Sequence, residues 1–252
     1  MAETGERGEP LLRLAGVSRQ YGEREALQSL DLEVFPGACT ALFGHNGSGK
    51  STLLRIACGR DLPTTGSALF DGRPVDEDDP EVRARVAVAG DTVAFYPDLT
   101  VREHLELITV AHGVADADVW LDQVLADRRL TGHADQLPSA LSSGQTQALQ
   151  LAAALVRPRD LLVLDEPEQR LDPAARTRLA ELLRGEKADG VAVLLATHQA
   201  ELVHAVADHV VVLEDGKVIA EGGPEVLAEL DAATASGGTD GAAGPAASGD
   251  SR

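Results

Sequence analysis

A run of small and polar residues after an apolar segment has the composition of a phosphate-binding loop. It reads Gly44-His45-Asn46-Gly47-Ser48-Gly49-Lys50-Ser51 and matches the pattern G-x-x-x-x-G-K-[ST]. Its glycines allow backbone N–H groups to converge on phosphate oxygens, because no Cβ stands in the way. Lys50 can reach β- and γ-phosphates, and the Ser51 hydroxyl suits Mg²⁺, a hard ion that prefers oxygen ligands.

The segments on either side support this interpretation. Residues 38–43 are apolar and predict a buried strand, and residues 49–58 predict a helix whose positive end points at the bound anion. A strand, a glycine-rich turn and a helix are the context that this motif requires. We therefore expect the nucleotide phosphates to contact Gly44, His45, Asn46, Gly47, Ser48, Gly49, Lys50, Ser51 and Thr52.

A second predicted strand ends in two carboxylates. Residues 161–164 are Leu-Leu-Val-Leu, a continuous apolar run, and Asp165 and Glu166 follow directly. Asp165 is placed to hold Mg²⁺ directly or through water, and Glu166 to orient and deprotonate an attacking water. The alternative is a strand end with solvated acids, which the phosphate loop upstream makes less favourable.

Strand-like and helix-like segments alternate between polar ends, which predicts an α/β fold. Strands are expected at 11–17, 30–35, 38–43, 86–89, 161–164, 191–196, 210–213 and 218–220. Helices are expected at 49–58, 100–112, 116–126, 142–156 and 173–185. Residues 1–10 and the Gly/Ala/Ser-rich residues 231–252 are expected to be disordered, which leaves a folded domain at 11–230.

The net charge and the apolar segments limit the classes of function that fit this chain. The 252 residues carry a formal net charge of -19, and an acidic surface repels phosphate backbones, so we expect no nucleic-acid partner. No run approaches the roughly 20 apolar residues of a membrane helix. If the protein works at a membrane, we expect another chain to carry the spans.

With these motifs in place, the chain resembles the ABC ATPase family. Leu141-Ser142-Ser143-Gly144-Gln145 is similar to the signature loop of that family, and it opens a predicted helix shortly before Asp165. Leu171-Asp172 resembles the loop that crosses to a partner subunit, His198 the switch histidine, and Tyr21 the adenine-stacking aromatic. The resemblance covers residues 11–230 and implies an antiparallel β portion near the N-terminus with a helical subdomain inserted at about 91–155.

The resemblance implies a head-to-tail dimer of two nucleotide-binding subunits, identical or different. Each ATP would lie between the phosphate loop of one subunit and Ser142, Ser143, Gly144 and Gln145 of the other. His198 would bond the γ-phosphate and hold Glu166 in register. A structural histidine and a core tyrosine are the alternatives at His198 and Tyr21.

The chain departs from the family pattern at several positions. Asp91 stands where a Gln is usual; its carboxylate can face Mg²⁺, and slower or altered hydrolysis is possible. Ser143 replaces a signature glycine, Gln169 a small residue, and Ala148, Leu149 and Gln150 stand where basic residues are usual.

Since none of these changes removes Lys50, Ser51, Asp165, Glu166 or His198, we expect an ATPase that uses ATP and Mg²⁺. The preferred interpretation is the motor of a membrane transporter, best matched by exporters, bound to a transmembrane permease subunit at the cytoplasmic face of the cell membrane. The alternatives are a non-transport ABC ATPase and a regulatory cassette with weak hydrolysis.

Overall fold

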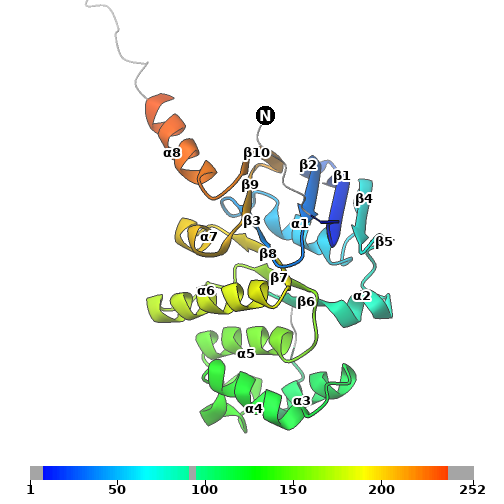
Figure 1. Cartoon of the computed structure of the whole chain (residues 1–252), viewed down its shortest axis with the longest axis vertical. Coiled ribbons are helices and arrows are strands. Elements are labelled where there is room, and N and C mark those ends of the chain that lie inside the picture. The colour runs from blue at the N-terminus through cyan, green and yellow to red at the C-terminus, as the bar shows by residue number, and fades with distance from the viewer. Residues whose placement is uncertain (1–7, 91–94, 238–252) are drawn as a thin grey trace, which may run out of the picture.

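Two β-sheets form the framework of the protein, whose computed structural model describes residues 8–90 and 95–237 (Figure 1). Within these residues the smaller sheet has the antiparallel order β2-β1-β4-β5, formed by β1 (Leu12–Tyr21), β2 (Arg24–Val34), β4 (Thr65–Phe70) and β5 (Arg73–Pro74). The larger sheet has the order β10-β9-β3-β8-β7-β6, formed by β3 (Cys39–Phe43), β6 (Val86–Ala89), β7 (Leu161–Asp165), β8 (Ala192–Thr197), β9 (His209–Glu214) and β10 (Lys217–Gly222). From β9 to β6 neighbouring strands are parallel, and β10 pairs antiparallel with β9 at the edge.

Helices cover both faces of the larger sheet. They are α1 (Lys50–Ala57), α2 (Pro80–Arg85), α3 (Val101–Ala111), α4 (Ala117–Asp127), α5 (Ser143–Leu155), α6 (Pro173–Ala188), α7 (Ala200–Val206) and α8 (Val226–Gly237), with short turns of 3-10 helix at Thr131–His133 and Pro138–Ala140. Leu53, Leu54 and Ile56 of α1 share one core with residues of both sheets. Helices α5, α6 and α7 pack on the opposite face, where alternate residues of β7 and β8 form a second core.

Strand register places the ends of β3, β7 and β8 level with one another. Phe43 at the end of β3 pairs with Thr197 at the end of β8, and Asp165 at the end of β7 pairs with Ala196. Parallel strands present their carboxyl ends at the same edge of a sheet, which is where open α/β sheets bind ligands. The phosphate loop, the acidic pair and His198 therefore follow strands that end at one edge.

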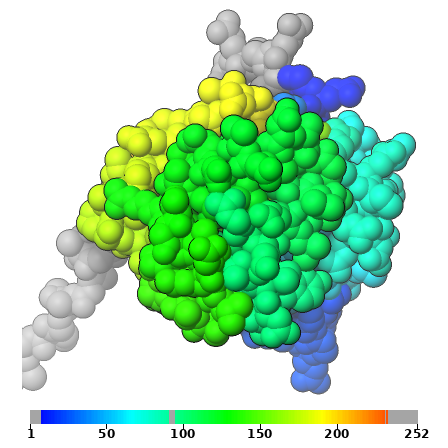
Figure 2. Space-filling view, turned by 90° about the horizontal axis from the view of Figure 1, so that it is seen from below, coloured from blue at the N-terminus to red at the C-terminus, as the bar shows by residue number. Residues whose placement is uncertain are grey.

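Helices α3, α4 and α5 form a unit with its own apolar core, in which Leu105, Leu121 and Leu149 are fully buried. Capping boxes begin α3 at Thr100 and α5 at Ser142, satisfying backbone N–H groups that the first turn leaves unpaired. Figure 2 shows that this helical region covers most of the face seen from below. Among the described residues, no helix combines the length and the apolar character needed to cross a membrane.

The predicted α/β cassette, with its antiparallel β portion and inserted helices, is confirmed. The C-terminal prediction is wrong in part, because α8 continues through residues 231–237, which were expected to be disordered. Those residues are rich in alanine, the best helix former, and the helix begins in the packed residues Val226 and Leu227. Residues 1–7 and 238–252 lie outside the described part of the chain.

Candidate functional site

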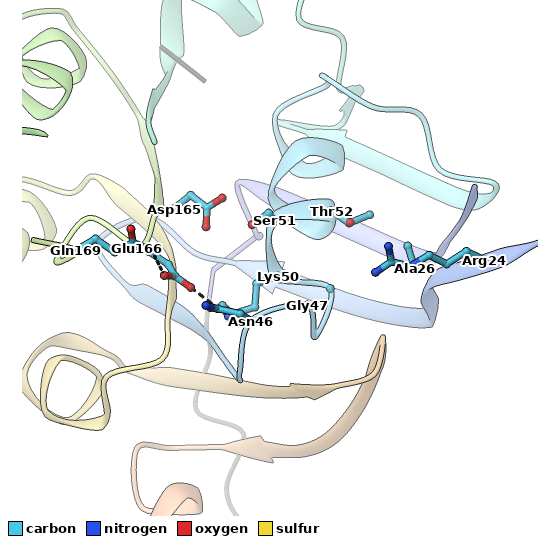
Figure 3. A pocket seen from close by; sticks show the side chains of 11 residues that line it. Arg24, Ala26, Asn46, Gly47, Lys50, Ser51, Thr52, Asp165, Glu166 and Gln169 are labelled. Carbon is cyan, nitrogen blue, oxygen red and sulfur yellow. Dashed lines mark hydrogen bonds and ion pairs between the residues drawn. The ribbon is translucent and has the colours of Figure 1, made fainter. Parts of the chain in front are cut away.

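A cavity of about 300 Å³ opens where β3 and β7 end (Figure 3). Its lining comes from β2, the phosphate loop, α1 and the loop after β7: Arg24, Ala26, Asn46, Gly47, Gly49, Lys50, Ser51, Thr52, Asp165, Glu166 and Gln169. The two motifs predicted to act on a nucleotide therefore face one space. In Figure 3 the Asp165 side chain points toward Ser51 and the Glu166 side chain toward Lys50.

The phosphate loop depends on its glycines for backbone shape. Gly47 has φ +87°, a left-handed conformation that favours glycine. A Cβ on Gly44 would lie 2.2 Å from the carbonyl oxygen of Leu213, so only glycine fits there. Ser48 is fully buried, whereas His45 and Asn46 are exposed on the outer side of the loop. Of the predicted phosphate contacts, Gly44, His45 and Ser48 are not among the residues that line the cavity, and their contact with phosphate stays a prediction.

Lys50 lies folded over its own loop. Its Nζ donates to the carbonyl oxygens of Gly44 at 2.7 Å and His45 at 3.0 Å, and it lies 3.4 Å from Glu166 Oε1. The Lys50 side chain is 4% exposed. The ammonium is thus held by groups that a phosphate oxygen can replace, at the position where the loop would present it to a nucleotide.

Glu166 contacts Lys50, Gln169 and His198. Its Oε2 accepts a hydrogen bond from Gln169 Nε2 and lies 3.3 Å from His198 Nδ1. Burial alone would raise the pKa of Glu166, but the Gln169 hydrogen bond and the charges of Lys50 and His198 together lower it. The side chain is therefore held ionised, in the state that a general base requires.

The backbone conformation of Glu166 supports a functional role for this residue. Its φ is +45°, which is uncommon for a residue other than glycine. Such conformations persist only where the surrounding structure holds them in place, and they are often found at active sites. Here the Glu166 N–H donates to the carbonyl oxygen of Ala196 at 2.9 Å, which ties the turn to β8.

The oxygen donors of this cavity fit a magnesium ion. The Ser51 hydroxyl and the Asp165 carboxylate line it together, and Mg²⁺ in phosphate sites typically takes only one or two protein oxygens, the rest coming from phosphates and water. Within the described residues no cluster of three or more His, Cys, Asp or Glu side chains forms a dedicated metal cage. Asp91, the third predicted ligand, lies outside the described residues.

The predicted signature loop does not reach this cavity within one chain. Ser142 and Ser143 are exposed at the N-terminus of α5, and none of the residues from Ser142 to Gln145 is among those that line the cavity. Gln145 closes the capping box: its Oε1 accepts from the Ser142 N–H at 2.7 Å. The loop is thus preformed, with its helix N-terminus facing outward and available to a second molecule.

Tyr21 also stands apart from the cavity lining. It ends β1, is 41% exposed, and donates a hydrogen bond to Asp61. The Arg19 guanidinium lies 4.4 Å from its ring centroid, over one face of the ring. The core-tyrosine alternative is therefore wrong, because the ring is at the surface; adenine stacking stays a prediction.

Sequence reasoning missed several residues of the site. Arg24 and Ala26 line the cavity because β2 passes beside the phosphate loop, a proximity that only the packing of the two sheets creates. Gln169 stands where a small residue is usual, and its side-chain amide donates a hydrogen bond to Glu166. A polar residue three positions after the acidic pair was the available signal, but its direction depends on the turn that begins at Glu166.

Replacing Gln169 by Ala should lower kcat about tenfold and leave ATP affinity nearly unchanged, since a hydrogen bond to a charged group is worth about 1.5–3 kcal/mol. The variant loses the donor that holds Glu166. Steady-state ATPase assays and ATP titrations measure the two quantities. The matched control is Gln123→Ala, which removes an amide from Asp127 at 2.9 Å on the surface of α4. A wild-type kcat in Gln169→Ala would contradict this role.

Glu168 is a buried acid beside the site. It is 0% exposed, and its Oε1 accepts a hydrogen bond from Thr197 Oγ1. Its Oε2 has no hydrogen-bond partner in the described part of the chain. Burial raises the pKa of Glu168 above its ordinary 4.5, and the charge of Glu166 adds to the rise, while the Thr197 bond and His198 oppose it.

Glu168→Gln should therefore stabilise the protein increasingly as the pH rises. An acid whose folded pKa is raised favours folding below its unfolded value, here 4.5, and that contribution is lost as the pH rises toward the folded value. A neutral amide suffers no such loss. We expect the difference in Tm between variant and wild type to grow as the pH rises above 4.5 in thermal denaturation. A pH-independent difference would contradict the raised pKa.

The fold and the site together define a phosphate-loop nucleotide hydrolase: a glycine loop with its lysine, a hydroxyl and a carboxylate for a metal, and an ionised acid beside them. Comparison with known proteins gives the family. The ABC transporter family matches residues 27–169, more than half of the chain. The chain belongs to the ABC transporter family, as an ATP-binding subunit with the ATPase activity of that family.

Two relatives that share one name match most of the chain in sequence. It is 35% identical over 223 residues to Nod factor export ATP-binding protein I of Cupriavidus metallidurans, covering 88% of this chain and 74% of that protein. It is 38% identical over 213 residues to the protein of the same name from Paraburkholderia xenovorans, covering 84% and 70%.

Solved structures agree with the fold. An ATP-binding subunit of an ABC transporter superposes with a TM-score of 0.80 at 29% identity, covering 88% of this chain and 93% of that one. A dimeric post-hydrolysis cassette bound to ADP and phosphate superposes with a TM-score of 0.76 at 26% identity.

Proposed function

We propose that this chain binds and hydrolyses Mg²⁺-ATP between two nucleotide-binding subunits and so powers export through a membrane permease. The observation that carries the catalytic part is the contact between Lys50 and Glu166 across a cavity that Ser51 and Asp165 also line. A phosphate-binding cation, a base and metal-binding oxygens are thereby within reach of one γ-phosphate.

The chemistry follows from the charges of these groups. Lys50 turns from Gly44, His45 and Glu166 to the β- and γ-phosphates, which releases the Glu166 carboxylate to face water. Ser51 and Asp165 would hold Mg²⁺, which when bound neutralises phosphate charge. Glu166 then accepts a proton from the attacking water, as a positioned general base.

His198 lies beside Glu166, where it can contact both the base and the phosphate. His198 Nδ1 lies 3.3 Å from Glu166 Oε2, and the His198 side chain is 44% exposed. The imidazole can therefore contact both the carboxylate and a γ-phosphate entering from solvent. We assign it the task of keeping base and phosphate aligned, and Tyr21 the stacking of adenine.

Dimer formation is supported by the separation of the two nucleotide-binding elements. Ser142, Ser143 and Gly144 face outward at the N-terminus of α5, away from the cavity of their own chain. A second subunit placed head to tail brings these donors to the γ-phosphate. Similar cassettes have been solved as dimers, one of them with ADP and phosphate bound.

A membrane partner is supported by the helical region and by the relatives. The apolar residues Tyr96, Leu107 and Val110 are 62%, 44% and 77% exposed on or next to α3. Exposed apolar side chains on one segment are typical of protein contact sites. The relatives named for export suggest the direction of transport, and a place on the cytoplasmic face of the cell membrane follows from the need to reach both ATP and a permease.

Affinity purification from detergent-solubilised membranes of the native cells tests this function. We expect a multi-span membrane protein in a fixed molar ratio to the chain. The control is a variant with Tyr96 and Val110 replaced by Asp, which should still bind ATP but lose the partner. Recovery of the wild type with ribosomes, with DNA-binding proteins or alone would contradict the transporter function and leave the ATPase chemistry standing.

A further inference from the structure

A buried hydrogen bond joins the loop after β7 to the end of β8. Glu168 and Thr197 are both 0% exposed, and Thr197 Oγ1 donates to Glu168 Oε1. The same hydroxyl oxygen accepts from the Gln199 N–H at 3.0 Å. The Thr197 side chain thus connects the acid of one loop to the backbone of the next turn.

The two connected segments carry the groups assigned to catalysis. Glu166 lies two positions before Glu168, and His198 follows Thr197 directly. The side chains of those two groups meet at the 3.3 Å contact between His198 Nδ1 and Glu166 Oε2, where His198 is 44% exposed and Glu166 11% exposed. A backbone bond from the Glu166 N–H to the Ala196 carbonyl also joins the two segments. A contact in which one partner is exposed does not by itself fix the His198 side chain, since exposed pairs contribute little in water. A buried bond immediately behind them can.

We propose that Glu168 is a positioning residue that, through Thr197, holds His198 and Glu166 in register for hydrolysis. The inference rests on the proposed roles of His198 and Glu166. The loop after β7 also contains two left-handed residues other than glycine, Glu166 at φ +45° and Arg170 at φ +60°. Glu168 lies between them. Its hydrogen bond to Thr197 therefore helps to hold a turn whose backbone would otherwise relax toward negative φ.

The chemistry of the buried Glu168 carboxyl argues against a purely structural role for this residue. A fully buried carboxyl with one unpaired oxygen is costly, and an apolar side chain of similar size would avoid that cost. Glu186 is the contrasting case: it is buried too, but Arg159 satisfies both of its oxygens, at 2.5 and 2.7 Å. Among the described residues Glu168 has no such cation, and its side-chain hydrogen bond goes to the residue that precedes His198.

The test measures kcat and ATP affinity in Glu168 variants of the full chain. Glu168→Ala should lower kcat about tenfold with ATP affinity within about twofold, the scale of one buried hydrogen bond lost from a catalytic alignment. Glu168→Gln keeps an acceptor for the Thr197 hydroxyl and should recover most of the rate. Thr197→Val removes the hydroxyl in nearly the same shape and should reproduce the Glu168→Ala defect, while Thr197→Ser should not.

A double-mutant cycle with His198 separates positioning from general damage. If Glu168 acts through His198, then His198→Ala should cost much less rate in the Glu168→Ala background than in the wild type. The control Glu186→Gln removes a charge from another buried acid and should lower Tm without changing kcat.

Two outcomes would overturn the inference: independent, multiplicative effects of Glu168→Ala and His198→Ala, or a wild-type kcat in a folded Thr197→Val protein. If Glu168→Ala fails to fold, Thr197→Val and Thr197→Ser decide the question. The failure of the proposed function looks different, because hydrolysis by the wild type would then not depend on Glu166 at all.

Discussion

Glu166→Gln should reduce ATP turnover by at least about 100-fold while ATP still binds, since positioned general bases contribute about 10²–10⁴-fold. The amide keeps the size of the side chain but cannot accept the proton of the attacking water. It also removes a negative charge beside the γ-phosphate, so ATP should bind as tightly as to the wild type or more tightly. Phosphate release and equilibrium ATP binding measure the two effects.

A second acid–histidine pair offers a matched control for this change. Glu221 Oε1 lies 2.9 Å from His209 Nε2 at the β9–β10 edge, outside the cavity. Glu221→Gln alters the same kind of pair and should leave turnover unchanged. Comparable rates in Glu166→Gln and the wild type would favour the regulatory alternative, in which the cassette binds ATP without hydrolysing it efficiently.

Lys50→Ala should abolish ATP binding at ordinary concentrations. The ammonium is 4% exposed and faces the place of the phosphates, where charge-assisted bonds of about 1.5–3 kcal/mol each are lost with it. Two such bonds correspond to about 100-fold or more in Kd. The measurement is an equilibrium titration with a fluorescent ATP analogue.

The chain contains a suitable lysine for comparison. Lys217 begins β10 and is exposed, so Lys217→Ala removes an equal charge away from the cavity and should bind ATP as the wild type does. Removing Lys50 also removes the ammonium that lies 3.4 Å from Glu166 Oε1. If Lys50→Ala bound ATP with an unchanged Kd, the cavity between β3 and β7 would not be the nucleotide site.

Local sequence was enough to predict the parts of the site that depend on strand ends. The phosphate loop, the acidic pair and His198 each follow an apolar strand, and parallel strands present those ends at one edge. The apolar runs at β7 and β8 predicted their burial on both faces correctly. Pro173 also predicted the start of α6 correctly, because proline is favoured in the first turn of a helix.

Contacts that depend on loop conformation could not be predicted in the same way. Gln169 reaches Glu166, and Glu168 reaches Thr197, only because the turn after β7 adopts left-handed backbone at Glu166. Nothing in the local pattern indicates positive φ at a glutamate. The strands β4 and β5 and the helices α2 and α7 were missed because they are short and get much of their stability from packing against longer elements.

If this chain powers a permease, ATP binding must drive a change in that membrane partner, and thermodynamic linkage makes the change directly measurable. A ligand can shift a conformational equilibrium only by its differential affinity for the two states, so the partner must in turn change the affinity for ATP. The measurement is the Kd of ATP for Glu166→Gln, free and in complex with the copurified permease. We predict values that differ by about fivefold or more. Identical values would contradict the account of this chain as a transport motor.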